Sequence, residues 1–281
     1  MMINYHYAFS YGIQVLMIDR FIHKTLGLPY RLKKQIDEGS GQAVIFLHGV
    51  ASSHHNWDAV IPHLKGVCRA VSFDLLGFGE SPKPDWASYT VDDHVKSLRR
   101  SITALSLDEP CVLVGHSMGG IIAVAYAAKY PADVSSLILC GLPIYTTQEH
   151  KGRLGLSLDR VYERIYQRII ANKSLSLHEA AIIKKFMKYS QEFEANETTW
   201  HGTAHSLQNT ILAQKTLEHA STLKLPIDLI SGKADPLVIK NHLSAFSKQA
   251  PQSKMIYINA AHTLNANYVA AIVSSIKSHL S

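Results

Sequence analysis

Residues 111–129 read CVLVGHSMGGIIAVAYAAK, and this stretch decides the fold. An apolar run of strand length leads into Gly115-His116-Ser117-Met118-Gly119, and an alanine-rich helical pattern follows. The pattern G-x-S-x-G between a strand and a helix is typical of a turn that projects a nucleophilic serine. Small residues on both sides let strand and helix approach closely and leave Ser117 in a strained backbone conformation. We therefore predict that Ser117 is a nucleophile; the alternative is a purely structural turn.

Similar apolar runs recur along the chain, with helical patterns between them. Continuous apolar runs are typical of strands that are buried on both faces of a parallel sheet. Strands that alternate with helices predict a doubly wound α/β fold. The expected strands are 31–37, 43–47, 67–74, 111–114, 134–140, 227–230 and 255–258. The expected core helices are 90–105, with a capping box from Thr90 and Asp93, 118–129, 236–248 and 265–280.

Residues 143–223 interrupt this alternation, because they show helical patterns and no strong strand pattern. A long helical stretch between two buried strands indicates an inserted cap and not a connecting loop. The signals are an apolar stripe (Leu158, Val161, Ile165, Ile169), a capping box (Ser176, Glu179) and a helical pattern over 203–216. We thus divide the chain into an N-terminal amphipathic segment (1–28), a core (29–142 and 224–281) and a helical cap (143–223).

The composition is that of an ordinary globular protein. The 281 residues are 47% hydrophobic and 18% charged, which excludes disorder for the bulk of the chain. The formal net charge is +6, but no block of like charges occurs, so we expect no nucleic-acid partner. The odd number of cysteines (Cys68, Cys111, Cys140) predicts buried free thiols in a reducing compartment, and no signal peptide is recognised. We expect a cytoplasmic location.

A serine nucleophile needs a base that takes its proton and an acid that orients the base. With this type of turn the order along the chain is serine, acid, histidine. Asp235 and His262 follow two predicted strands, so both lie at carboxyl ends of strands, where ligands collect. We predict Asp235 as the acid and His262 as the base. The alternatives are a helix cap for Asp235 and a solvated loop residue for His262; Asp228 is a competing acid, but it lies inside a strand.

Two backbone N–H groups must stabilise the developing oxyanion. We assign them to Met118, which follows the nucleophile, and to Val50 in His48-Gly49-Val50, where Gly49 makes room; an ordinary glycine turn is the alternative. His54 and His55 are candidates for a wall of the substrate entrance. The candidate substrate-binding residues are Gly49, His116, Leu142, Ile144, Leu237 and Val238.

At this point the chain resembles the α/β-hydrolase superfamily, in its capped serine esterase/lipase-like branch. The resemblance rests on His48-Gly49-Val50, on residues 74–81 (DLLGFGES), on residues 115–120 (GHSMGG), on residues 232–235 (GKAD) and on His262. It implies a mostly parallel, eight-stranded sheet with a helical cap over the site. Two departures are Ala261, where glycine often precedes the base, and the lack of an acidic residue shortly after His262. Ser117 stands where the related dehalogenases and epoxide hydrolases have Asp.

We therefore expect a carboxylesterase-like or lipase-like serine hydrolase that cleaves short- to medium-chain acyl esters through an acyl-enzyme intermediate. The same triad acting on a lactone, a thioester or a carbon–carbon bond is the nearest alternative, because specificity lies in the cap. A ligand-binding receptor with slow turnover is a second. The expected partner is a small-molecule ester. We expect no cofactor and no metal site; His201 and His205 lack the Glu of H-E-x-x-H.

The N-terminal segment has helical spacing of apolar residues at Ile13, Leu16, Met17 and Phe21. We favour packing of this helix on the cap or core. The less favoured alternative is association of residues 13–34 with a membrane surface through Arg20, Lys24, Lys33 and Lys34. Tyr145, Tyr162 and Tyr166 are candidates for an acyl pocket, although aromatic residues at this spacing are more often core. The expected state is a monomer or a homodimer.

Overall fold

The computed structural model describes residues 17–146, 158–186 and 194–280. Its centre is a seven-stranded sheet in the order β1-β3-β2-β4-β5-β6-β7. β1 runs antiparallel to β3, and every other neighbouring pair is parallel. The strands are β1 (Lys34–Glu38), β2 (Ala43–Leu47), β3 (Arg69–Phe73), β4 (Cys111–His116), β5 (Val134–Cys140), β6 (Ile227–Gly232) and β7 (Ser253–Ile258). The predicted α/β fold is confirmed.

The strand count corrects the expectation of eight strands. Within the described residues the sheet ends at β1 on one side and at β7 on the other. Before β1 the described chain is a short helical segment and a linker, and after β7 it forms the helix α9 (Ala266–His279). Neither flank supplies a further strand there.

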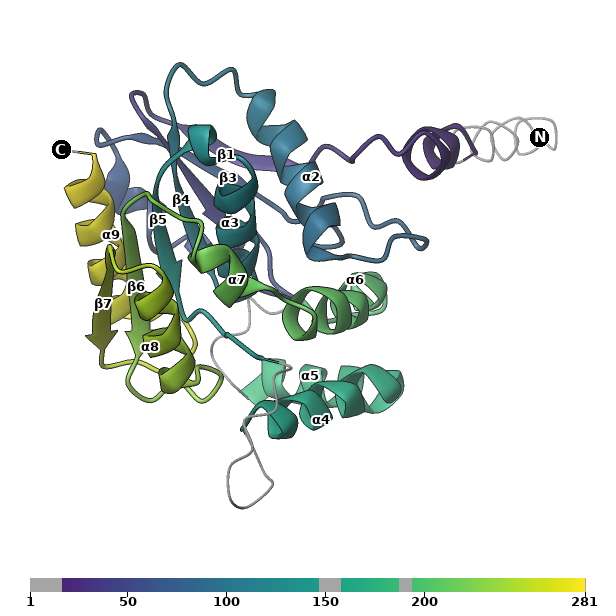
Figure 1. Cartoon of the computed structure of the whole chain (residues 1–281). Coiled ribbons are helices and arrows are strands. Elements are labelled where there is room, and N and C mark those ends of the chain that lie inside the picture. Colours follow the sequence, from purple (N-terminus) through teal and green to yellow (C-terminus); the bar gives the residue numbers. More distant parts are fainter. Residues whose placement is uncertain (1–16, 147–157, 187–193, 281) are drawn as a thin grey trace.

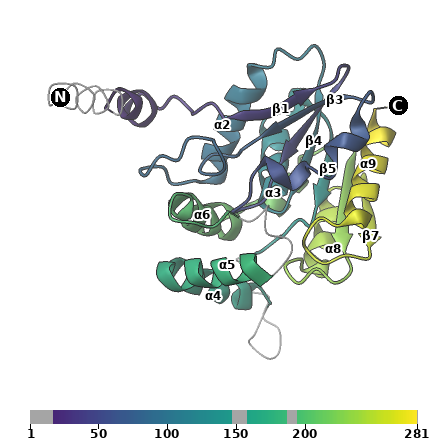
Figure 2. The same ribbon diagram turned by 180° about the vertical axis from the view of Figure 1, so that it is seen from behind.

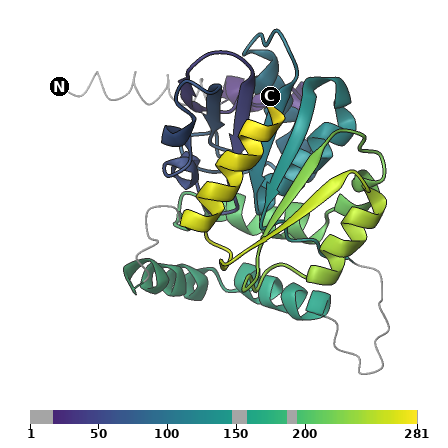
Figure 3. The same cartoon turned by 90° about the vertical axis from the view of Figure 1, so that its left-hand side faces the viewer.

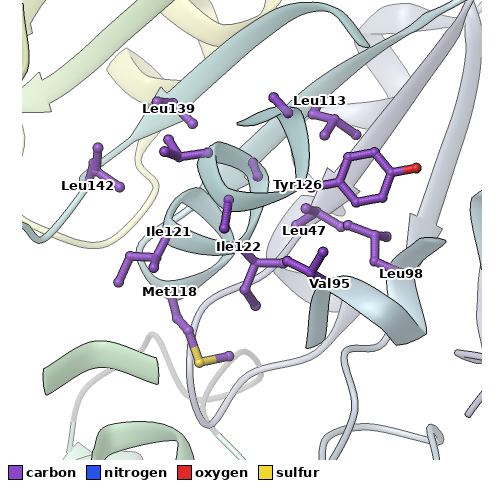
Figure 4. Close-up of a cluster of buried hydrophobic side chains, with 14 of the residues drawn as sticks. Leu47, Val95, Leu98, Leu113, Met118, Ile121, Ile122, Tyr126, Leu139 and Leu142 are labelled. Atoms are coloured by element: carbon purple, nitrogen blue, oxygen red, sulfur yellow. The ribbon is translucent and has the colours of Figure 1, made fainter. Parts of the chain in front are cut away.

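Each face of the sheet has its own hydrophobic core. The alternation is clearest on β2, where Ile45 and Leu47 point into one core while Val44 and Phe46 point into the other. The first core lies under α2 (Val91–Thr103), α3 (Met118–Lys129) and α8 (Lys240–Gln249), and Figure 4 shows α3 at its centre. The second lies under α9, seen in front of the sheet in Figure 3, and two short helices, η2 (His54–Trp57) and η3 (Ile61–Leu64). The three cysteines are free and buried, as predicted.

Helix boundaries agree with the prediction where local side chains set them. The capping box of α2 is present, since Thr90 Oγ1 accepts from Asp93 N and the Asp93 carboxylate accepts from Thr90 N. The core helix expected over 236–248 begins later than predicted, because α8 starts at Lys240 and not at Pro236. The carbonyls of Pro236 and Leu237 accept from tyrosine hydroxyls and not from N–H groups of a first helical turn.

Between β5 and β6 the described residues form helices and no strand, as predicted. It contains α4 (Leu158–Ala171), α5 (Lys173–Phe186), α6 (Trp200–Ser206), a π-helical turn η5 (Leu207–Leu212) and α7 (Thr216–Ala220). Figures 1 and 2 show α4, α5 and α6 gathered at one end of the sheet. It is the end toward which β6 and β7 point in Figure 1, the carboxyl end of the parallel strands. α7 instead packs on α3 and α8.

Two details of these helices differ from the prediction. Ser176 does not cap a helix, because α5 already begins at Lys173 and the Ser176 hydroxyl donates to Ile169 O, 3.0 Å away. On α4 the apolar stripe is largely exposed, at 57% for Leu158 and 45% for Ile165, whereas Tyr166 is buried. An aromatic side chain with a polar end fits this position, since its hydroxyl reaches a partner.

The first described residues, 17–25, are helical, with a π-helical turn η1 (Phe21–Thr25). Figures 1 and 2 show η1 at the periphery of the molecule, joined to β1 by an extended linker. Met17 and Phe21 are exposed, so the described part of this segment does not bury those side chains on the core. Among the described residues no helix is long and apolar enough to cross a bilayer.

Two adjacent glycines of α3 give a matched test of this architecture. A Cβ at Gly119 would overlap the backbone carbonyl of Leu47. At Gly120 the one tight contact of a Cβ would be the tip of the Leu142 side chain, at 3.0 Å, and its nearest backbone contact would be an ordinary 3.5 Å. We expect Gly119→Ala to lower the free energy of unfolding by about 3 kcal/mol or more, because backbone cannot yield as a side chain can. Gly120→Ala should change it by less than about 1 kcal/mol, since alanine favours the helix. Urea unfolding followed by tryptophan fluorescence measures both; equal effects would contradict the account.

Candidate active site

Ser117 occupies the sharp turn between β4 and α3. Its backbone lies at φ 53° and ψ −121°, a region that side chains rarely adopt. A Cβ at Gly115 would lie 2.6 Å from the backbone of Gly119, so the turn closes only with glycine there. Ser117 N donates to Cys140 O at 2.9 Å, which fixes the turn to the end of β5. The predicted strand–turn–helix context of Ser117 is therefore present.

The three residues predicted as a triad lie in one hydrogen-bonded series. His262 Nδ1 is 2.8 Å from Asp235 Oδ2, and His262 Nε2 is 3.0 Å from Ser117 Oγ. An ionised carboxylate only accepts, so Nδ1 carries the proton and Nε2 accepts from the serine hydroxyl. The Asp235 side chain is fully buried, while the His262 side chain is 20% exposed. The arrangement can move a proton from Ser117 to His262 and stabilise the resulting imidazolium.

The acid is held by its own loop. Asp235 Oδ1 accepts from Leu237 N at 2.9 Å, so both carboxylate oxygens have donors. The competing carboxylate is elsewhere: Asp228 Oδ2 lies 3.4 Å from His279 Nε2, near the end of α9. Sequence reasoning missed Gly141, which lies at φ +54° and whose added Cβ would approach Asp235 and the His262 ring to 3.3 Å. The available signal was its place in the sequence, since Gly141 directly follows β5, the strand that pairs with β4.

The loop after β2 is held by two hydrogen bonds of His48 and passes beside Ser117. His48 Nε2 accepts from Leu75 N at 2.8 Å, and its Nδ1 donates to Gly49 O at 2.7 Å. Burial lowers the pKa of His48, which keeps its ring neutral in this role. An added Cβ at Gly49 would lie 3.2 Å from Ser117 Cβ, so the loop passes directly beside the serine. Val50 follows at once, next to the site.

His116 is bound into the protein. Its Nε2 donates to His262 O at 2.9 Å, which secures the loop that carries the base. Burial, with a smaller effect of the neighbouring His262, lowers the pKa of His116 to about 3. The ring is thus neutral beside the imidazolium that the reaction would form. Of the other predicted substrate-binding residues, Leu142, Ile144 and Val238 are buried in the first core and Leu237 is half-buried. Their contact with substrate stays a prediction.

The three tyrosines singled out in the sequence contact the loop of the acid. Tyr145 OH donates to Leu237 O at 2.9 Å, and Tyr162 OH donates to Pro236 O. Tyr166 OH lies 3.3 Å from Tyr145 OH. Burial raises the pKa of Tyr145, so its hydroxyl keeps the proton that it donates. This part of the inserted helices therefore supports the Asp235 loop.

A second link runs from the inserted stretch to the loop after β2. Glu194 N donates to Ala51 O at 2.7 Å, and Ser53 Oγ donates to Glu194 Oε1 at 2.8 Å. The sequence carried no motif that would single out Glu194. His54 contacts the buried Asp74 carboxylate through its N and Nδ1, at 2.8 and 3.0 Å, and its place at a substrate entrance stays a prediction. His55 pairs with Asp58 on the surface.

Asp74 joins the loop after β3 to the segment between β2 and β3, because its carboxylate accepts from Glu80 N and His54 N. Burial alone would raise its pKa, but hydrogen bonds from the backbone N–H groups of Glu80 and His54 outweigh that effect and hold the pKa below its usual value.

In the part of the chain that the structure describes, no group of three His, Cys, Asp or Glu side chains could hold a metal ion. His201 Nε2 instead donates to Ala87 O at 3.2 Å.

Comparison with known proteins identifies the family to which the chain belongs. The sequence profile of the alpha/beta hydrolase fold matches residues 42–266. A probable lysophospholipase, BODYGUARD 4 of Arabidopsis thaliana, is 30% identical over 241 residues, which are 73% of this chain and 55% of that protein. Lipase 1 of Psychrobacter immobilis is 40% identical over 100 residues, which are 36% of this chain and 31% of the lipase. The match thus spans about half of the plant relative and less of the bacterial one.

Solved structures share the fold at low sequence identity. An esterase from Exiguobacterium antarcticum superposes with a TM-score of 0.74 at 20% identity, covering 89% of this chain and 95% of that one. An enol-lactonase from Burkholderia xenovorans superposes with a TM-score of 0.73 at 18% identity, covering 89% and 96%. At such identities the likeness shows the fold alone. Together with the match over residues 42–266, it establishes that the chain belongs to the α/β-hydrolase fold family, with esterase- and lipase-like relatives.

Proposed function

We propose that the protein is a serine hydrolase of carboxylic esters. The observation that carries the proposal is the series Ser117–His262–Asp235, with distances of 3.0 and 2.8 Å. Ser117 Oγ attacks the ester carbonyl while its proton passes to His262 Nε2. The C–O bond to the alcohol then breaks, and the same proton goes to the leaving oxygen. Water, activated by His262, releases the acid and restores Ser117.

The proposal also needs two backbone donors that stabilise the oxyanion. Met118 is the first residue of α3, so its N–H has no acceptor within the helix. Val50 follows Gly49, whose added Cβ would lie 3.2 Å from Ser117 Cβ. We assign both N–H groups to the tetrahedral intermediate, an interaction that typically accounts for a factor of about 10² to 10³ in rate per donor. No cofactor enters this scheme.

The substrate is expected to be a small ester with a short or medium acyl chain. Ser117 is only 6% exposed, so the acyl group must enter a confined site. In this proposal the helices between β5 and β6 act as a cap over the carboxyl end of the sheet, and residues 143–223 decide which substrate enters. The relatives include lipases, an esterase and a probable lysophospholipase, and these names favour esters. Because the solved structures include an enol-lactonase, a lactone is the nearest alternative substrate to an open-chain ester.

The direct test is hydrolysis of p-nitrophenyl esters of graded chain length. We expect Ser117→Ala to lower kcat by a factor of about 10⁴ or more, because the nucleophile is lost. Ser244→Ala, which removes a hydroxyl at an exposed site of α8, is the matched control and should leave kcat unchanged. The chain length that gives the highest kcat/KM measures the acyl site.

Turnover that survives Ser117→Ala would contradict the assignment of the nucleophile. An inactive wild type that binds esters tightly would favour the receptor interpretation. Activity on lactones or thioesters alone would keep the triad and change the substrate class.

The tyrosine contacts to the acid loop predict a positioning effect. Tyr145→Phe combined with Tyr162→Phe removes the hydroxyls that donate to Leu237 O and Pro236 O. We expect kcat to fall roughly tenfold with little change in KM, since Asp235 would orient His262 less well while ester binding is retained. Tyr257→Phe, on an exposed residue of β7, is the control. A selective rise in KM would instead assign these hydroxyls to substrate binding.

A further inference from the structure

The helical segment at residues 17–25 is attached to the protein by its polar side. Tyr30 OH donates to Asp19 Oδ2 at 2.7 Å, and the His23 ring stacks on the Tyr30 ring with centroids 3.7 Å apart. Asp19 and His23 are one turn apart and lie on one face of the helix. Tyr30 itself is buried, at 8% exposure, and packs in the first hydrophobic core.

The opposite side of the segment is apolar and faces solvent. At 100° per residue, Met17, Ile18 and Phe21 lie across the helix from Asp19 and His23. Their exposed fractions are 66%, 59% and 55%, and Leu26 and Leu28 add 64% and 43% in the adjoining linker. A surface helix ordinarily turns its apolar face to the core. This orientation is the reverse, and an exposed apolar patch of this kind marks a surface for a partner.

Basic side chains flank the apolar side. Arg20 and Lys24, one turn apart, are exposed, as is Arg31 in the linker. Within the described part of the chain, none of these three has an acidic partner, whereas Lys33 pairs with Glu80 and Lys34 with Asp37. The sixteen residues that precede the segment contain no charged side chain and include Tyr5, Tyr7, Phe9 and Tyr11. Aromatic residues of this kind are enriched where water meets lipid.

This chemistry fits an anionic lipid surface better than a second copy of the chain. An apolar helix face bordered by Arg and Lys is the arrangement that binds anionic bilayers in the plane of the interface. In a symmetric pair built on the same patch, Arg20 and Lys24 of one copy would approach those of the other. The whole chain also carries a net charge of +6.

We propose that residues 17–28 hold the protein on the surface of an anionic lipid bilayer. Met17, Ile18 and Phe21 enter the boundary between headgroups and acyl chains, and Arg20 and Lys24 contact the headgroups. Asp19, His23 and Tyr30 keep the helix in this orientation. Because a single short amphipathic segment binds weakly, the attachment is reversible. The proposal does not depend on the reaction at Ser117.

The test is sedimentation of the full chain with vesicles of phosphatidylcholine, with and without phosphatidylglycerol. We expect binding that needs the anionic lipid and weakens with salt. Ile18→Ser combined with Phe21→Ser should weaken the partition coefficient roughly tenfold or more. Arg20→Gln combined with Lys24→Gln should weaken it about fivefold for each charge removed. The control is Val67→Ser combined with Tyr257→Ser, at residues that are 37% and 42% exposed elsewhere on the surface.

The midpoint of thermal unfolding, followed by circular dichroism, serves as the check on folding of each variant, and it should be unchanged. Wild-type protein that stays in the supernatant with both vesicle types would overturn the proposal. So would binding that the Ile18 and Phe21 substitutions leave intact. Self-association that these substitutions abolish, without vesicle binding, would assign the patch to a second copy instead.

Discussion

The close approach of α3 to the ends of β2 and β4 is the constraint on which the rest of the site depends. It requires glycine at 115 and 119, since any side chain there would overlap backbone atoms of the neighbouring element. In this turn Ser117 has a positive φ of 53°, which residues with side chains rarely adopt. The approach also places the loop after β2 against the serine. The proposed nucleophile and the proposed oxyanion donors therefore lie around one packing contact, and burial of the two hydrophobic cores offsets the cost of the strained turn.

Around this contact, the base and the acid are each held by residues outside the triad. His116 donates to the carbonyl of His262, and Tyr145 donates to the carbonyl of Leu237, two residues after the acid. Each such hydrogen bond stabilises the fold by only about 1 kcal/mol, but an error of an ångström in geometry lowers a reaction rate strongly. The inserted helices thus contribute to the geometry of the relay as well as lying over the end of the sheet.

The features that a short stretch of sequence determines could mostly be predicted. Buried strands appeared as apolar runs, and the turn at Ser117 could be recognised because its glycines, its serine and its flanking elements are adjacent in the chain. What depends on distant contacts was not predictable. α8 begins at Lys240, after a stretch whose carbonyls accept from Tyr145 and Tyr162, and Gly141 lies where Asp235 and His262 meet. Likewise, the orientation of residues 17–25 depends on Tyr30, whose ring binds the polar side of that helix.

The most direct test of Ser117 as a nucleophile that His262 and Asp235 activate is the rate at which a fluorophosphonate labels the protein. Intact mass and peptide mapping follow the labelling. The Ser117 Oγ–P bond forms as fluoride leaves, so the account predicts one adduct per chain, on Ser117. It further predicts that Asp235→Asn slows labelling by a factor of about 10³ to 10⁴, since His262 then loses its proper tautomer. Asp228→Asn should label at nearly the wild-type rate. Labelling at another residue, or equal rates in the two variants, would contradict the proposed relay.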